Sequence, residues 1–321
     1  MDKLGNLFSD AMNHLERVAK NEATPCDVMT GFEQLDKLLC GFDNGDLIVV
    51  GSRPGVGKTS FVISCALNNA RAGVPVLFYT FDMTSDQIIR RFMSAVSGVN
   101  LEQIRSGMLS QEDWETLVTR TKELNELPIF IVSDAPRDIE ELCAHVEKQV
   151  IDSEVKIVYI DYLHFLDCKN SNTVENRYQE VSMFSRSLKA LARKLNIPIV
   201  VTSQLNRKPE ERQEKYDKLY KRPNMYDLRD SGTICEDSNL VFLISRPELI
   251  YHGDVDSEGN NIKGLAEIIV AKHNNGPTDT VALNYNKNTC AFSNRNPEDW
   301  FEWFDYFING FIQVSKVAVL L

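Results

Sequence analysis

The sequence predicts an α/β fold in which a mostly parallel β-sheet is flanked by helices. Short runs that are apolar at nearly every position alternate along the chain with helical patterns. Strands of this kind are buried on both faces, as is typical of a parallel sheet covered by helices. An amphipathic helix, expected over residues 1–20, precedes the alternation. With 321 residues, the chain can hold one large domain or two, with a substantial core.

The N-terminal helix is the first expected element. Its apolar side chains recur at helical spacing, namely at Leu4, Leu7, Phe8, Met12, Leu15 and Val18. Residues 21–30, which include Pro25, are expected to form a linker. A helix set apart by a linker must bury its apolar face, so we expect it to pack either on its own domain or on a neighbouring subunit.

The other elements follow in strand and helix order. The expected strands are residues 47–51, 74–81, 129–132, 156–161, 197–203, 240–245, 266–272 and 280–284. The expected helices are 58–72, one opened by Thr84, 110–124, 136–151 and 175–195. Gln87 stands three residues after Thr84, which is the spacing of a capping box. Two long polar stretches, 206–229 and 248–263, interrupt this order, and loops of that length are usually functional or mobile.

The composition excludes several classes of protein. With 43% hydrophobic and 25% charged residues, disorder, a collagen-like fibre and a disulfide scaffold are excluded. The net charge of −11 argues against non-specific coating of nucleic acid, but it allows a local basic patch or a channel formed by assembly. Seven scattered cysteines without a Cys-x-x-Cys pair indicate free thiols. No signal peptide and no apolar run of roughly 20 residues is visible, so we expect a cytoplasmic protein with no membrane partner.

The segment after the first strand carries the clearest chemical signal. It follows the phosphate-binding pattern G-x-x-x-x-G-K-[ST], except that Ser52 replaces the first glycine and Gly51 lies one residue early. Glycines let backbone N–H groups wrap phosphate oxygens, and the helix N-terminus adds positive potential. Lys58 is expected to reach the β- and γ-phosphates of ATP, and the Thr59 hydroxyl to bind Mg²⁺. The expected nucleotide-binding residues are Ser52, Arg53, Pro54, Gly55, Val56, Gly57, Lys58, Thr59 and Ser60.

Three further candidates stand at the carboxyl ends of expected strands, where open α/β sheets bind their ligands. Asp161 is the candidate acid that holds Mg²⁺ together with Thr59. Asp82 is the candidate base that polarises the attacking water, and Gln204 is the candidate sensor of the γ-phosphate. Each residue alone is a weak signal, but together with the phosphate-binding loop they predict an Mg·ATP site.

These motifs resemble those of the DnaB-type hexameric replicative DNA helicases, which have a RecA-like P-loop ATPase fold. The similarity covers about residues 24–293. It is carried by residues 30–36 (TGFEQLD), 53–59 (RPGVGKT), 82–87 (DMTSDQ), 160–163 (IDYL), 175–177 (ENR), 185–192 (SRSLKALA), 203–207 (SQLNR), 227–232 (DLRDSG) and 272–277 (KHNNGP).

The resemblance implies an organisation and an assembly. Residues 1–20 resemble the family's linker helix, which packs on the adjacent subunit, and 21–30 its linker. Residues 31–293 correspond to the ATPase domain, and 294–321 form an aromatic-rich tail that docks on the core or binds a partner. Such proteins form homo-hexameric rings with ATP between subunits and single-stranded DNA in the channel, and they meet helicase loaders or primase.

The resemblance also assigns two sites that no local pattern defines. By resemblance, residues 227–232 align with the channel loop that grips DNA, and the expected DNA-binding residues are Arg229, Asp230, Ser231 and Gly232. Arg229 supplies a cation, and Ser231 and Gly232 supply backbone N–H groups. Lys272 aligns with a lysine that reaches into the neighbouring subunit's ATP site.

The chain departs from the family pattern at three places. Asp82 stands where the family has Glu, and its side chain is one methylene shorter. Asn274 stands where the family has a trans-acting arginine, which is worth roughly 10³–10⁵ in rate in well-studied systems. The family's N-terminal helical domain is absent from this sequence, as expected of a minimal form or of a fragment.

The leading functional hypothesis is an ATP-driven motor that translocates on single-stranded DNA and unwinds duplex DNA. One alternative is a RecA-like recombinase or recombination mediator that does not unwind DNA. Another is a nucleotide-binding ring or clamp subunit with weak catalysis, which the departures at Asp82 and Asn274 favour.

Overall fold

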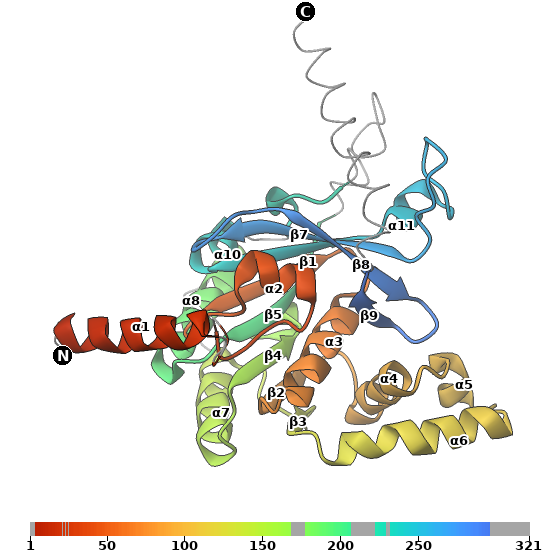
Figure 1. The fold of residues 1–321 in the computed structure, drawn as a ribbon, viewed down its shortest axis with the longest axis horizontal. Helices are drawn as coiled ribbons and strands as arrows, with labels where there is room; N and C mark the ends of the chain where they lie inside the picture. Colours follow the sequence, from red (N-terminus) through yellow and green to blue (C-terminus); the bar gives the residue numbers. More distant parts are fainter. Residues whose placement is uncertain are drawn as a thin grey trace, which may run out of the picture.

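One β-sheet forms the centre of the domain (Figure 1). The computed structural model describes residues 4–20, 22, 24, 26–167, 177–206, 222–228 and 232–295. Within these residues the strand order is β3-β2-β4-β5-β1-β6-β7-β8-β9. The first six in that order are parallel, and they are β3 (Ile129–Val132), β2 (Val76–Thr80), β4 (Ile157–Asp161), β5 (Ile199–Gln204), β1 (Leu47–Ser52) and β6 (Leu240–Ser245). The antiparallel strands are β7 (Leu265–His273), β8 (Thr280–Asn286) and β9 (Ala291–Asn294), so the predicted mostly parallel sheet is confirmed.

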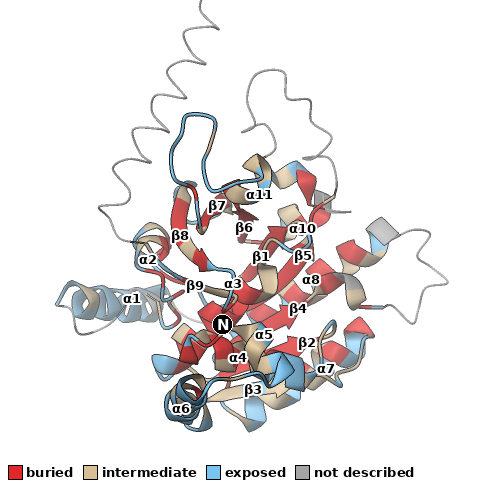
Figure 2. Cartoon of the chain, turned by 90° about the vertical axis from the view of Figure 1, so that its right-hand side faces the viewer, coloured by how far each residue is buried: buried red, intermediate tan, exposed pale blue. Residues whose placement is uncertain are grey.

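The sheet is buried on both faces because alternate side chains of each strand enter different cores. On β1, Ile48 and Val50 join the core under α2 (Glu33–Leu39), α3 (Lys58–Arg71) and α4 (Ser85–Ser97). Leu47 and Val49 join the core under α7 (Ile139–Asp152) and α8 (Arg177–Leu195). Figure 2 shows the result, with buried strands between the two helical layers.

Most predicted element boundaries are confirmed to within a few residues, and the differences have local causes. Strands β2 and β5 begin directly after Pro75 and Pro198, later than expected, because proline has no N–H to donate to a ladder. Helix α7 begins three residues late, since Asp138 caps it through the N–H groups of Glu140 and Glu141. The predicted capping box at Thr84 and Gln87 is present at the start of α4.

Several short elements escaped sequence analysis. They are α2, α5 (Leu101–Ser106), α10 (Gly232–Asp237), α11 (Pro247–Tyr251) and β9. Each is too short to display a helical or strand period. The expected helix 110–124 is α6 (Gln111–Arg120) followed by a 3₁₀ turn at Thr121–Asn125. Further 3₁₀ turns occur at Leu163–Phe165 and Met225–Asp227.

Helix α1 (Leu4–Ala19) extends away from the sheet, on the side opposite to α4, α5 and α6 (Figure 1). The predicted helix is confirmed, and its apolar face is open. Leu4, Phe8 and Leu15 are exposed by 80%, 63% and 58%. This face therefore has no partner within the described part of its own domain.

The described cysteines are Cys26, Cys40, Cys65, Cys143, Cys235 and Cys290, and all are free thiols, as predicted. Burial raises the pKa of the Cys65 thiol, which makes it an inert core residue. Of the helices that the structure describes, none has both the length and the apolar character needed to cross a membrane. Residues 207–221 and 296–321, which hold most of the first polar stretch and the predicted tail, lie outside the described residues.

Candidate nucleotide site

The predicted strand, glycine-rich loop and helix are present, since β1 ends at Ser52 and α3 begins at Lys58. Gly57 has a φ of +125°, and a Cβ there would lie 3.3 Å from the ring of Phe292, so the turn into α3 needs glycine. A glycine is needed at position 51 for a different reason. A Cβ at Gly51 would approach Leu228 and Leu243 to 2.8 and 2.9 Å, so this early glycine serves packing of the sheet rather than phosphate binding.

The two predicted metal ligands are hydrogen-bonded to each other. The Thr59 hydroxyl donates to Asp161 Oδ2 at 2.7 Å, although the residues are 102 positions apart. Strand β4 places Asp161 beside the loop, and the neighbouring strand β5 adds Thr202, whose hydroxyl donates to Asp161 Oδ1 at 2.5 Å. Sequence analysis missed Thr202. The only signal was a polar residue directly after the apolar residues 199–201 of the strand.

Burial disfavours the charged forms of Asp161 and Lys58, and neighbouring groups favour them. Burial raises the pKa of Asp161, and hydrogen bonds from Thr202 and Thr59 and the charge of Lys58 oppose the rise. Burial lowers the pKa of Lys58, and Asp161 and Asp82 oppose the fall. Lys58 Nζ also donates to the backbone oxygen of Ser52 at 3.3 Å. Both groups would gain from a ligand of opposite charge, a cation at Asp161 and an anion at Lys58.

A cavity of about 340 Å³ gathers the predicted site residues. It is lined by Pro54, Gly55, Gly57, Lys58, Thr59, Ser60, Asp82, Asp161 and Gln204 from the prediction, and by Met83, Arg91, Tyr162, Tyr285 and Cys290, which were not predicted. Most of the unpredicted residues come from α4, from the turn between β2 and α4, and from the β8–β9 hairpin. These segments are distant in sequence from the loop.

Three predicted nucleotide-binding residues have other surroundings. Ser52 ends β1 and is fully buried. Arg53 and Val56 line a neighbouring cavity of about 400 Å³, and Arg53 Nη1 donates to the backbone oxygen of Leu205 at 3.1 Å. Their side chains do not line the cavity at Lys58.

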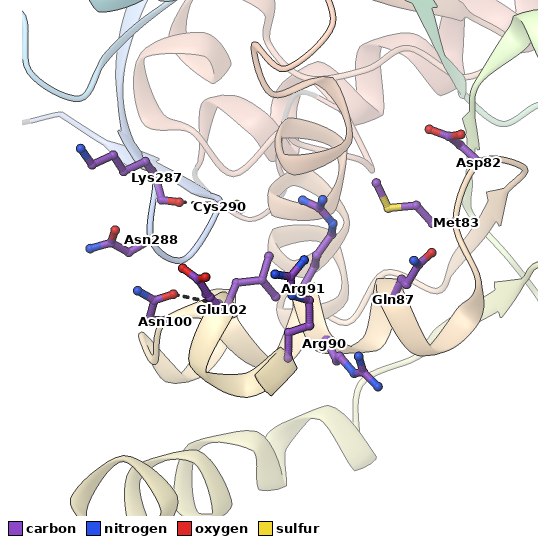
Figure 3. Close-up of a pocket in the computed structure, with 12 residues that line it drawn as sticks. Asp82, Met83, Gln87, Arg90, Arg91, Asn100, Glu102, Lys287, Asn288 and Cys290 are labelled. Carbon is purple, nitrogen blue, oxygen red and sulfur yellow. Dashed lines mark hydrogen bonds between the residues drawn. The ribbon is translucent and has the colours of Figure 1, made fainter. Parts of the chain in front are cut away.

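A larger cavity of about 640 Å³ adjoins the first, and the two share Asp82, Met83, Arg91 and Cys290 (Figure 3). Helices α4 and α5 and the β8–β9 turn form its wall. Arg90, Arg105 and Lys287 make this wall basic.

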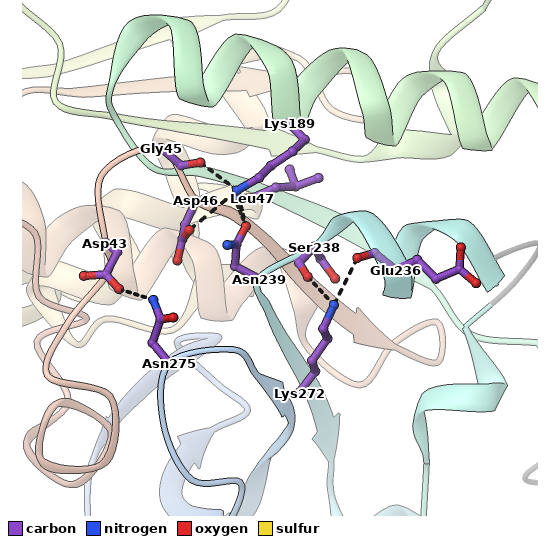
Figure 4. Close-up of polar contacts among 10 residues, drawn as sticks. All are labelled: Asp43, Gly45, Asp46, Leu47, Lys189, Glu236, Ser238, Asn239, Lys272 and Asn275. Atoms are coloured by element: carbon purple, nitrogen blue, oxygen red, sulfur yellow. Dashed lines mark hydrogen bonds and ion pairs between the residues drawn. The ribbon is translucent and has the colours of Figure 1, made fainter. Parts of the chain in front are cut away.

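Lys272 does not line the cavity at Lys58 of its own chain. Its Nζ donates to the backbone oxygens of Cys235, Glu236 and Ser238 at 2.7, 3.1 and 2.5 Å, and so caps the C-terminal end of α10 (Figure 4). Helix α10 begins at Gly232, the last residue of the predicted DNA-binding loop. The role of Lys272 in a neighbouring subunit stays a prediction.

Arg229, Asp230 and Ser231 of the predicted DNA-binding loop lie outside the described residues. The segment that enters this loop is attached to the end of β5. Leu228 bridges to Leu205, and Asn206 N donates to Asp227 O at 2.8 Å. Gln204 directly precedes this bridge, so the proposed γ-phosphate sensor and the predicted loop share one strand end.

A polar network around Lys189 and Asp46 predicts that folding stability depends on pH. Lys189 Nζ donates to Gly45 O at 2.9 Å and to Asn239 Oδ1, and it lies 3.6 Å from Asp46 Oδ1 (Figure 4). Burial raises the pKa of Asp46 to about 6, and the charge of Lys189 only partly opposes the rise.

As the pH rises from about 4 to about 6, folding stability is expected to fall, because in this window Asp46 keeps its proton in the folded state but has lost it in the unfolded state. For one proton, the free energy of unfolding can change by at most about 1.4 kcal/mol per pH unit. In Asp46→Asn, the free energy of unfolding, measured by chemical denaturation, should lose this part of its dependence on pH. Asp27→Asn, at an exposed carboxylate, is the control and should keep the parental slope. An unchanged slope in Asp46→Asn would contradict the assignment.

Comparison with known proteins adds the family relationship. Residues 27–294 match the family model described as DnaB-like helicase C terminal domain. The chain is 35% identical over 290 residues to replicative DNA helicase DnaB of Geobacillus stearothermophilus, covering 90% of this chain and 61% of that one. It is 34% identical over 283 residues to replicative DNA helicase DnaC of Bacillus subtilis (strain 168), covering 88% and 60%. The chain thus spans about 60% of the length of these relatives.

Two solved structures are similar over most of the chain. One, described as an ATPase domain, matches with a TM-score of 0.80 and 26% identity, over 92% of this chain and 100% of that one. The other, a DnaB-like replicative helicase whose structure was described with its interactions with primase, matches with a TM-score of 0.77 and 26% identity, over 92% of this chain and 68% of that one.

Proposed function

The chain belongs to the family of DnaB-like helicase C-terminal domains, and from this premise we propose that it hydrolyses Mg·ATP to move along single-stranded DNA and unwind duplex DNA during replication. The observation that carries the proposal is the hydrogen-bonded group of Thr59, Asp161 and Thr202. Thr59 and Asp161 of this group line a cavity that Lys58, Asp82 and Gln204 also line. Such a set of side chains suits a triphosphate and a divalent cation.

The donor chemistry of the cavity fits Mg²⁺, which prefers oxygen ligands and near-octahedral geometry. Thr59 and Asp161 would hold the ion, because a hydroxyl and a carboxylate already converge there. When bound, Mg²⁺ supplies neutralisation of the negative charge on the β- and γ-phosphate oxygens. Thr202 keeps the Asp161 carboxylate in its orientation by occupying the other oxygen.

The remaining roles follow from position. Lys58 would donate to the β- and γ-phosphates, and the backbone N–H groups of the loop would surround the phosphate oxygens. Asp82 follows β2 and lines the same cavity, where its carboxylate would orient and accept a proton from the attacking water. Gln204 would report the γ-phosphate to the predicted DNA loop through the Leu205–Leu228 bridge.

The open face of α1 and a groove on α4–α6 support a ring, with 1–20 as linker helix and 31–293 as ATPase domain. The groove has a volume of about 420 Å³ and includes Ile89, Met93, Ile104, Leu109, Trp114 and Leu117. Because the helix and the groove lie on opposite sides of the domain (Figure 1), a contact between them is head to tail, and such contacts give a ring when the rotation between subunits closes. We assign α1 of one subunit to the groove of the next in a homo-hexamer. A helicase loader or primase is a further partner in this proposal.

The proposal is tested by steady-state ATP hydrolysis with and without single-stranded DNA, together with unwinding of a forked duplex. We expect hydrolysis to be stimulated by DNA and the affinity for DNA to fall steeply with salt. Lys58→Ala should reduce turnover by at least about 10²-fold, because the phosphates lose their fixed cation. Arg71→Ala, at an exposed residue paired with Glu123, is the matched loss of a positive charge on the same helix and should keep parental turnover.

One observation favours a second function, that of a ring or clamp subunit with weak catalysis. Asp82 is the carboxylate proposed to orient the attacking water, and its side chain is one methylene shorter than the glutamate of the family. A water that is held about 1 Å from its reactive position can cost on the order of 10²-fold in rate. Tight nucleotide binding with negligible turnover, with or without DNA, would support this second function and reject the motor.

A further inference from the structure

Tyr226 presents an aromatic ring to solvent from a segment that is otherwise packed. Its side chain is 86% exposed, whereas the next two residues, Asp227 and Leu228, are 1% and 3% exposed. A single exposed apolar side chain needs no special explanation by itself. Tyr226 differs from such a residue in the support of its backbone and in its place in the fold.

The turn that carries Tyr226 has a defined conformation. Tyr226 is the central residue of the 3₁₀ turn at Met225–Asp227, which Asn224 caps. The Asn224 side chain accepts from Tyr226 N at 3.0 Å, and Asn224 N donates to Asp227 Oδ2 at 2.7 Å. Asp227 N donates back to Asn224 O at 3.0 Å. These hydrogen bonds fix the backbone from which the ring projects.

Two contacts anchor this turn to the sheet, one on each side. Before the turn, Arg222 Nε donates to Glu267 Oε2 of β7 at 2.9 Å, and the Glu267 side chain is only 5% exposed. After the turn, Leu228 bridges to Leu205 at the end of β5. The backbone at Tyr226 is therefore ordered before any ligand arrives, and preorganisation of this kind lowers the entropic cost of binding.

The place of Tyr226 indicates the kind of ligand. Residues 227–232, which directly follow it, are those that sequence analysis predicts as the DNA loop. That loop is expected to contact backbone phosphates, which position a strand but leave its bases unbound. The bases of a single strand each have a π-face that can stack on an aromatic ring. An exposed tyrosine beside a phosphate-binding loop has the chemistry to bind such a base.

We propose that Tyr226 provides the ring on which one base of bound single-stranded DNA stacks. This inference rests on the proposed binding of single-stranded DNA by the chain. Stacking accepts any of the four bases, so the contact serves a protein that moves along DNA without regard to sequence. It adds an apolar contact to the charged contacts that the phosphates make.

The test measures the Kd of the full chain for fluorescein-labelled oligo(dT) and for an abasic strand of the same length, by fluorescence anisotropy with a non-hydrolysable ATP analogue. Tyr226→Ala should weaken binding of oligo(dT) by about 5- to 150-fold, the range expected for the loss of one stacked base. Its Kd for the abasic strand should stay within about threefold of the parental value, because that strand has no base to stack.

Two variants control for the loss of a ring and for the loss of its position. Tyr226→Phe keeps the ring and should bind oligo(dT) like the parent. Phe130→Ala removes a ring that is 42% exposed on β3, the outermost strand of the sheet, and should also bind like the parent. In Tyr226→Ala the dependence of log Kd on log salt should keep the parental slope, because no phosphate contact is lost.

Three results would overturn the inference. One is a Kd of Tyr226→Ala for oligo(dT) within about twofold of the parent. Another is an equal loss of affinity for both strands, which would mark Tyr226 as a residue that only shapes the loop. The third is a lower molar mass of Tyr226→Ala in solution, which would identify a contact between subunits. If the parent binds neither strand, the proposed function fails and this inference with it, whereas a parent that binds both leaves the proposed function intact whatever Tyr226→Ala shows.

Discussion

Asp161→Asn is expected to reduce ATP turnover by at least about 10²-fold and, at the same time, to make the nucleotide-free protein more stable. The loss of turnover follows because the amide is a poor ligand for the divalent cation that Asp161 and Thr59 are proposed to hold. The gain in stability follows because the carboxylate is 2% exposed and burial raises its pKa. A neutral amide removes the cost of a buried charge.

The gain has a definite pH dependence. Because the pKa of Asp161 is raised, the folded parent loses stability as the pH rises above the ordinary Asp value, and Asp161→Asn does not. Thermal unfolding without nucleotide should show an increase in Tm that grows with pH, by roughly 2–4 °C for each 1 kcal/mol of relief. Mg·ADP should raise the Tm of the variant less than that of the parent.

Thr202→Val provides the contrast. It removes a hydroxyl that donates to Asp161 Oδ1 and leaves the buried carboxylate in place. An unpartnered buried acceptor costs about 1–3 kcal/mol, so this variant should be less stable than the parent. The assignment is contradicted if Asp161→Asn hydrolyses ATP like the parent, or if it is destabilised as much as Thr202→Val.

The second large effect concerns assembly. Phe8→Asp is expected to convert the proposed hexamer into smaller species, because Phe8 lies on the exposed apolar face of α1. The matching surface is the groove on α4–α6, where Trp114 is exposed by 54%. Burying a large apolar side chain contributes about 1.5–3 kcal/mol, and the contact is repeated at every interface of a ring. Trp114→Glu, on the receiving side, should have the same effect.

The measurement is molar mass in solution, by light scattering after size exclusion, with ATP turnover recorded on the same fractions. Asn13→Asp introduces the same charge on the polar face of α1 and is the control, which should keep the parental mass. Circular dichroism should show that the helix content of Phe8→Asp is unchanged. A parental mass for both Phe8→Asp and Trp114→Glu would reject the assigned contact.

Much of the site could be predicted from sequence because its parts are local. The RecA-like α/β class is confirmed by the parallel sheet and by the similar solved structures. Apolar strands, the capping box at Thr84 and the loop before Lys58 each depend on neighbours within a few residues. Asp82, Asp161 and Gln204 were found because parallel strands bring their carboxyl ends to one edge.

What the sequence by itself determined, then, is the order of the strands and helices along the chain, the glycine-rich loop before Lys58 and the acids that follow the strands. The tertiary structure alone decided that Thr202 donates a hydrogen bond to Asp161, that Gly51 is required by Leu228 and Leu243, and that Arg91 lines the cavity at Lys58. It also decided that Lys272 caps α10 within its own chain. These contacts join residues that are far apart along the chain or face each other across elements. No local period or spacing encodes such contacts, because they form only when strands from different parts of the sequence pack side by side.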